Sequence, residues 1–131
     1  MEIKPTYVTF KQAKLLKEKG FDEKVEGCYF DNQFNKITNG VRNSVYQSTR
    51  YISAPEQWQV VEWLRVNHGI WIEVHHIRTS SINRFHVIIW DYKNLEDYIT
   101  IYHDGIGPGY KVWDTPQAAY SAAFDYILTK I

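Results

Sequence analysis

The spacing of apolar residues changes at Gly69, and this change constrains the fold more than any other feature of the sequence. Over residues 54–68 apolar side chains recur at helical spacing, whereas over residues 70–103 they alternate with polar ones, as in half-buried strands. The alternation falls into three runs, at residues 70–75, 85–90 and 98–103. Because the links between these runs are short and polar, consecutive strands should pair antiparallel. The sequence therefore predicts an antiparallel meander over residues 70–103.

Three sequence signals mark helix starts. Thr9 and Gln12 have the spacing of a capping box, and Gly20 follows as a left-handed C-cap. Pro55 and Pro116 each stand where a first helical turn tolerates the missing N–H. The predicted helices span residues 10–20, 54–68 and 115–130. In the second of these helices the expected apolar stripe comprises Trp58, Val60, Val61 and Leu64.

The region between the first two helices is less regular. Residues 25–30 have the composition of a strand, residues 31–33 can turn the chain, and residues 34–37 can form a second strand. The tract 38–50 has few apolar residues and predicts either a functional loop or a further hairpin. We expect one α+β domain over residues 1–131, in which three helices pack on an antiparallel sheet of three to five strands.

Charge and composition exclude some functions. The chain has 15 basic and 15 acidic residues and a net charge of zero, whereas nucleic-acid binders depend on a basic excess. No stretch is long and apolar enough for a membrane span, and the N-terminus lacks the apolar run of a signal peptide. Cys28 is the only cysteine, which suits a reducing compartment. A protein partner and a cytoplasmic location are the expectations, and the oligomeric state stays open.

Aromatic residues are numerous, with 5 Trp, 10 Tyr and 6 Phe. Within the predicted meander some of them alternate with Ile72 and Ile89, and so should share the opposite face of the sheet. If helices cover only one face, these rings form an exposed patch with the composition of a protein interface. If the 10–20 helix or the 38–50 tract covers them, they are ordinary core. The candidate binding residues are Trp71, His75, Trp90 and Tyr92.

A second hypothesis is a small metal-dependent or acid–base enzyme. Glu73, His75 and His86 fall on one predicted face, and a group of this composition can hold zinc. No HxH or HxxxH pattern supports that site, and no conspicuous nucleophile or base stands out. We therefore assign no catalytic residue, no metal ligand and no cofactor, and a non-enzymatic role is favoured.

Three stretches carry a resemblance to a known group of proteins. They are QAKLLKEKGFD at residues 12–22, APEQWQVVEWLR at 54–65 with GIWI at 69–72, and TPQAAY at 115–120. Together they resemble small uncharacterised proteins encoded by phages and prophages of Bacteroidetes-type gut bacteria. The stretches lie mostly on predicted helices, so they identify no functional residue. The resemblance implies a phage-encoded accessory protein that binds a host or phage macromolecule inside the bacterial cell, or else a virion or assembly component.

Overall fold

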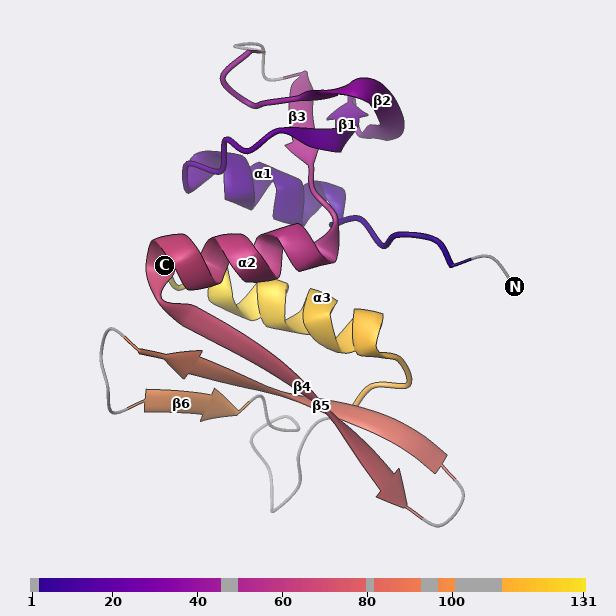
Figure 1. Cartoon of the computed structure of the whole chain (residues 1–131), viewed down its shortest axis with the longest axis vertical. Helices are drawn as coiled ribbons and strands as arrows, with labels where there is room; N and C mark the ends of the chain where they lie inside the picture. Colours follow the sequence, from indigo (N-terminus) through magenta and orange to yellow (C-terminus); the bar gives the residue numbers. More distant parts are fainter. Residues whose placement is uncertain (1–2, 46–49, 80–81, 93–96, 101–111) are drawn as a thin grey trace. The chain divides into compact units, whose positions relative to one another are not determined.

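The computed structural model describes residues 3–45, 50–79, 82–92, 97–100 and 112–131 (Figure 1). Within them the chain forms three helices and two three-stranded antiparallel sheets, which confirms the α+β class. The antiparallel strands are divided between two sheets of three strands each, a division that the sequence did not indicate. The chain also groups into two compact units, Met1–Val60 with Asp125–Ile131, and Val61–Phe124. A single domain over residues 1–131 stays a prediction.

The first unit contains helix α1, Phe10–Glu18, and its predicted caps are confirmed. The Thr9 hydroxyl accepts the backbone N–H of Gln12 at 3.2 Å, and the Gln12 side chain accepts that of Thr9 at 3.0 Å. Beyond the helix Gly20 adopts a φ of 93°, and the N–H of Phe21 donates to the carbonyl of Leu16. Phe21 is buried there, so the cap also closes the core at this end of the helix.

The sheet of the first unit has the order β2-β1-β3. Strand β1, Val25–Phe30, turns into β2, Gln33–Val41, through two residues with positive φ, Asp31 and Asn32. Two such residues between paired strands match the type I′ hairpin turn, as expected for residues 31–33. Strand β3, Tyr51–Ala54, pairs with the other side of β1 and was not predicted. It lies at the end of a polar tract, and its four residues give too short a pattern to recognise.

A buried asparagine joins two segments of the first unit. The side-chain amide of Asn43 donates to the carbonyl of Phe21 at 2.7 Å, and its oxygen accepts the backbone N–H of Ser53 at 2.9 Å. All three residues are at least nine-tenths buried. The segment after β2, which was predicted as a loop or a hairpin, is thus fixed by a polar bridge rather than by apolar anchors.

The second unit contains the predicted meander in the order β4-β5-β6. These strands span Ile70–Thr79, Ile82–Asp91 and Asp97–Thr100, and predicted strand residues 101–103 lie outside the described part. Helices α2, Gln57–His68, and α3, Pro116–Ile127, each contribute most of their residues to this unit. Of the described helices, none combines the length and apolar character that a bilayer crossing requires.

Helix α2 differs from expectation at its start. It begins at Gln57 rather than at residue 54, because Ala54 is the last residue of β3. Its buried stripe is built on Val60 and Leu64, whereas Trp58 is 64% exposed, so the prediction that Trp58 belongs to this stripe was wrong. Trp58 lies two residues before Val60, about 200° away around the helix axis, and therefore points from the opposite face.

Candidate functional site

The strand register of the second unit brings the predicted binding residues onto one face of the sheet. In the β4–β5 pair Trp71 lies opposite Trp90, and His75 lies opposite His86. Side chains alternate between the two faces of a strand, so Glu73 shares this face with Trp71 and His75. The Tyr92 ring lies just beyond β5 and packs against both tryptophans. We call this set the aromatic face, defined by residues Trp71, Glu73, His75, His86, Trp90 and Tyr92.

The other face of the same strands is core. Ile70 and Ile72 on β4 are 3% and 6% exposed, and Val87 and Ile89 on β5 are fully buried. These residues alternate with those of the aromatic face. The sheet is therefore two-sided, and the aromatic face is the side that the apolar core leaves uncovered.

The rings of the aromatic face are exposed but held in place. Trp71 is 45% and Tyr92 is 52% exposed, while Trp90 is half-buried. The Trp71 and Tyr92 ring centroids lie 6.2 Å apart in an edge-to-face arrangement, and those of Trp90 and Tyr92 lie 6.4 Å apart in a stacked one. The backbone N–H of Tyr92 also donates to the carbonyl of Gly69 at 3.0 Å. Of the two alternatives left by the sequence, exposure is thus confirmed for Trp71 and Tyr92.

Charged groups border these rings. The Arg65 guanidinium lies 5.4 Å from the centroid of the Trp71 ring, which is cation–π distance, and it also pairs with Glu62. Sequence reasoning missed Arg65, because its contact with Trp71 joins a helix to a strand. The only signal was the Glu62 and Arg65 spacing, which predicts an ion pair within the helix and nothing about the sheet.

Glu73 connects the rings to the histidines. Its carboxylate lies 3.1 Å from Nε2 of His75. The neighbouring Trp90 indole, and to a smaller extent His75, holds the pKa of Glu73 below its ordinary value. The carboxylate therefore stays ionised at neutral pH and fixes the orientation of the His75 ring.

The two histidines form a stacked pair. The His75 and His86 ring centroids lie 5.0 Å apart with an interplanar angle of 11°. Burial, and to a smaller extent the neighbouring His75, lowers the pKa of His86. The neutral form of the His86 ring is therefore favoured. Among the residues that the structure describes, no group of three or more His, Cys, Asp and Glu side chains is arranged to hold a metal ion.

The aromatic face can thus present rigid, half-exposed rings beside groups of both charges. Neither its hydrogen bonds nor its ion pairs identify a reaction. Comparison of the chain with protein-family models, with curated proteins and with solved structures found no match.

Proposed function

We propose that this chain is a non-enzymatic accessory protein that binds another protein through the aromatic face. The observation that carries the proposal is that Trp71 and Tyr92 are about half exposed while their neighbours hold the rings in place. Large aromatic side chains dominate the binding energy of protein interfaces, and a ring that is already ordered loses little entropy on binding. The aromatic face offers this combination.

A protein partner fits the face better than a nucleic acid does. Bases can stack on exposed rings, but nucleic-acid affinity comes largely from contacts with phosphates. Here Arg65 is paired with Glu62, and Glu73 adds a further negative charge close to the rings. The chain as a whole has no net charge. A partner with apolar and mixed-charge groups suits this surface.

The resemblance to phage-encoded proteins supplies the cellular context of the proposal. We infer that the protein acts in the cytoplasm of a bacterial host, where it engages a host or phage macromolecule. The single cysteine suits that reducing compartment, and burial raises the pKa of the Cys28 thiol, which keeps it protonated.

Affinity capture tests the proposal. Tagged protein is used to capture partners from infected and uninfected bacterial lysates, and the bound proteins are identified by mass spectrometry. We expect a near-stoichiometric partner. Its affinity for the protein should fall about tenfold or more with Trp71→Ala and with Tyr92→Ala, since central aromatic residues contribute about 2 kcal/mol or more to binding. Val45→Ala is the control, because Val45 is 66% exposed and lies in the first unit.

Two results would count against the aromatic face as the binding site. Full retention of the partner by both aromatic variants would remove these residues from the interface. Unfolding of Trp71→Ala and of Trp90→Ala, measured by circular dichroism, would mean that the rings serve the core instead.

A second candidate is an acid–base or metal-dependent enzyme that uses Glu73, His75 and His86. Its metal form has no support among the described residues, where no group of three such side chains is arranged to hold an ion. The 3.1 Å contact between the Glu73 carboxylate and the His75 ring favours this candidate, since a carboxylate orients many catalytic and metal-bound histidines. Metal analysis of protein purified without a histidine tag tests the metal form. If the protein contains stoichiometric zinc and His75→Ala loses it, this candidate is supported over the binding protein. If the protein is metal-free and added zinc does not stabilise it, the metal form is excluded.

A further inference from the structure

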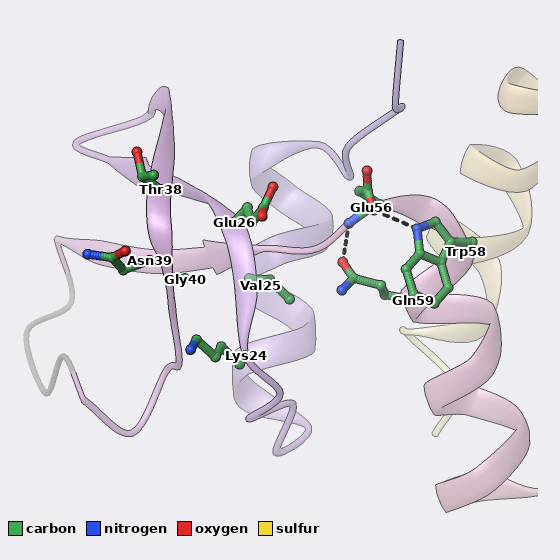
Figure 2. A pocket seen from close by; sticks show the side chains of 9 residues that line it. All are labelled: Lys24, Val25, Glu26, Thr38, Asn39, Gly40, Glu56, Trp58 and Gln59. Atoms are coloured by element: carbon green, nitrogen blue, oxygen red, sulfur yellow. Dashed lines mark hydrogen bonds between the residues drawn. The ribbon is translucent and has the colours of Figure 1, made fainter. Parts of the chain in front are cut away.

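A groove of about 750 Å³ is lined entirely by residues of the first unit (Figure 2). Three segments that are distant in the sequence form it: residues 24–26 at the start of β1, residues 38–40 of β2, and residues 56–59 at the start of α2. Its volume falls within the range of small-molecule sites. The lining residues are Lys24, Val25, Glu26, Thr38, Asn39, Gly40, Glu56, Trp58 and Gln59.

A bulge in β2 forms one wall of the groove. Val25 pairs with Val41 and Gly27 pairs with Lys36, so residues 37–40 of β2 stand opposite the single residue Glu26. Gly40 closes the bulge with a φ of 79°, a backbone conformation that favours glycine. Bulges of this kind turn strands away from their partners and occur often beside functional sites.

The opposite wall is the first turn of α2, and backbone bonds fix its position. The N–H of Val8 donates to the carbonyl of Pro55 at 3.0 Å, and the N–H of Gln57 donates to the carbonyl of Thr6 at 2.8 Å. The N–H of Glu56 donates to the side-chain oxygen of Gln59 at 2.8 Å. The residues of this wall are therefore held before any ligand arrives.

Trp58 is held in the same way. Its indole N–H donates to the Glu56 carboxylate, although the side chain is 64% exposed (Figure 2). It is the most exposed tryptophan among the described residues. A fixed indole that keeps most of its surface in water offers its face to a ligand.

Other rings in this protein are already covered by cations. Arg65 lies over Trp71, Arg50 over Phe30, Lys14 over Phe10, and Lys130 over Tyr126. Within the described residues no cation lies over Trp58, although tryptophan is the ring that binds cations best.

The charges of the groove favour a cation as well. Neither Glu26 nor Glu56 takes part in an ion pair within the described part of the chain. In Figure 2 both carboxylates project in the same direction, whereas the Lys24 ammonium is directed toward β2. Two carboxylates beside one ammonium repel phosphate and other anions. An uncharged apolar ligand would leave the negative charge of both carboxylates unbalanced.

We propose that this groove binds a cationic group, a guanidinium or an alkylammonium, that stacks on Trp58 and pairs with the carboxylates of Glu56 and Glu26. The group can belong to a free small molecule or to an Arg or Lys side chain of a peptide. This site is independent of the aromatic face, because its residues belong to the first unit and those of the face to the second.

Nuclear magnetic resonance tests the site directly. ¹⁵N-labelled protein is titrated with agmatine and, separately, with the capped tripeptide acetyl-Gly-Arg-Gly-amide. The indole N–H signal of Trp58 is assigned by its loss in Trp58→Phe. We expect this signal and the amides of the lining residues to shift in a saturable way with the cationic probes, and not with acetyl-Gly-Gln-Gly-amide or inorganic phosphate.

Two variants test the roles of the ring and of the charge. Trp58→Leu and Glu56→Gln should each weaken binding of the cationic probes about two- to fivefold, as cation–π contacts and exposed ion pairs do. Glu56→Gln keeps an acceptor for the indole N–H and removes only the charge. Glu18→Gln removes an exposed carboxylate outside the groove and should leave the affinity unchanged.

Each outcome has a defined meaning. Saturable binding of agmatine indicates that a free cation suffices, and binding of the Arg tripeptide alone indicates a peptide ligand, so both support the proposal. It is overturned if neither cationic probe shifts the Trp58 signal, if the Gln tripeptide or phosphate does so equally, or if the two groove variants bind like the unaltered protein.

Discussion

Replacing Gly27 with alanine should lower the free energy of unfolding by about 2 kcal/mol. A Cβ atom at this position would lie 2.6 Å from the backbone oxygen of Ala54 and 2.9 Å from ring carbons of Tyr7 and Phe34. Gly27 pairs with Ala54 in the β1–β3 ladder, so relieving the contact requires a shift of a buried strand. Overpacking costs about 1–3 kcal/mol, here at the upper end because a backbone atom is involved. The reduced entropy of the unfolded alanine chain offsets about 0.4–1 kcal/mol.

Urea denaturation followed by far-ultraviolet circular dichroism measures the effect. With a denaturant slope of about 1–3 kcal/mol per molar urea, the midpoint should fall by about 1 M. Adding Phe34→Leu to Gly27→Ala should restore part of the loss, because a side chain can be shortened whereas the Ala54 carbonyl cannot. A midpoint for Gly27→Ala within about 0.2 M of the unaltered protein would refute the close packing on which this magnitude depends.

Two further predictions concern buried polar groups. Asn43→Ala should lower the free energy of unfolding by about 2–3 kcal/mol, because it removes the two buried hydrogen bonds that the Asn43 side chain makes to the carbonyl of Phe21 and the N–H of Ser53. Urea denaturation measures the loss, and an unchanged midpoint would contradict it. The pKa of His86 lies below its ordinary value of 6.5 through burial and the nearby His75, so below about pH 6.5 the unfolded chain binds more protons than the folded one. Stability should therefore decrease as the pH falls from about 7.5 to about 5.5. The decrease should be smaller in His86→Asn, and an equal decrease in that variant would assign the pH dependence to other groups.

Local signals in the sequence predicted those elements whose determinants are themselves local. The capping box of Thr9 and Gln12 identified α1, and the alternation after Gly69 identified the β4–β5–β6 meander. The same alternation predicted which side of this sheet carries Trp71, since the period of a strand assigns faces without knowledge of the register. That His75 lies directly opposite His86 could not be predicted in this way, because it depends on the register between β4 and β5, which the structure supplies.

Features that depend on distant segments were not predictable in this way. Strand β3 exists because β1 offers a second edge for pairing, and the division into two sheets depends on which edges remain free. The groove needs the β2 bulge, the start of β1 and the start of α2 together, and no single segment contains a motif for it. Trp58 was assigned to the apolar stripe because it recurs with Val61 and Leu64 at helical spacing. A stricter helical periodicity centred on Val60 and Leu64 would have placed it outside.

The two proposed sites use tryptophan in different ways, and this difference makes them separable. Arg65 already covers Trp71, so a further cation gains little there, and the ring is best suited to apolar contact with a protein partner. Within the described residues no cation lies over Trp58, and the groove that it lines carries two carboxylates, Glu26 and Glu56, that take part in no ion pair, so the affinity of the groove should depend on the charge of the ligand. Raised salt should therefore weaken ligand binding at the groove more than partner binding at the aromatic face, because screening acts on exposed charges and hardly on buried apolar area.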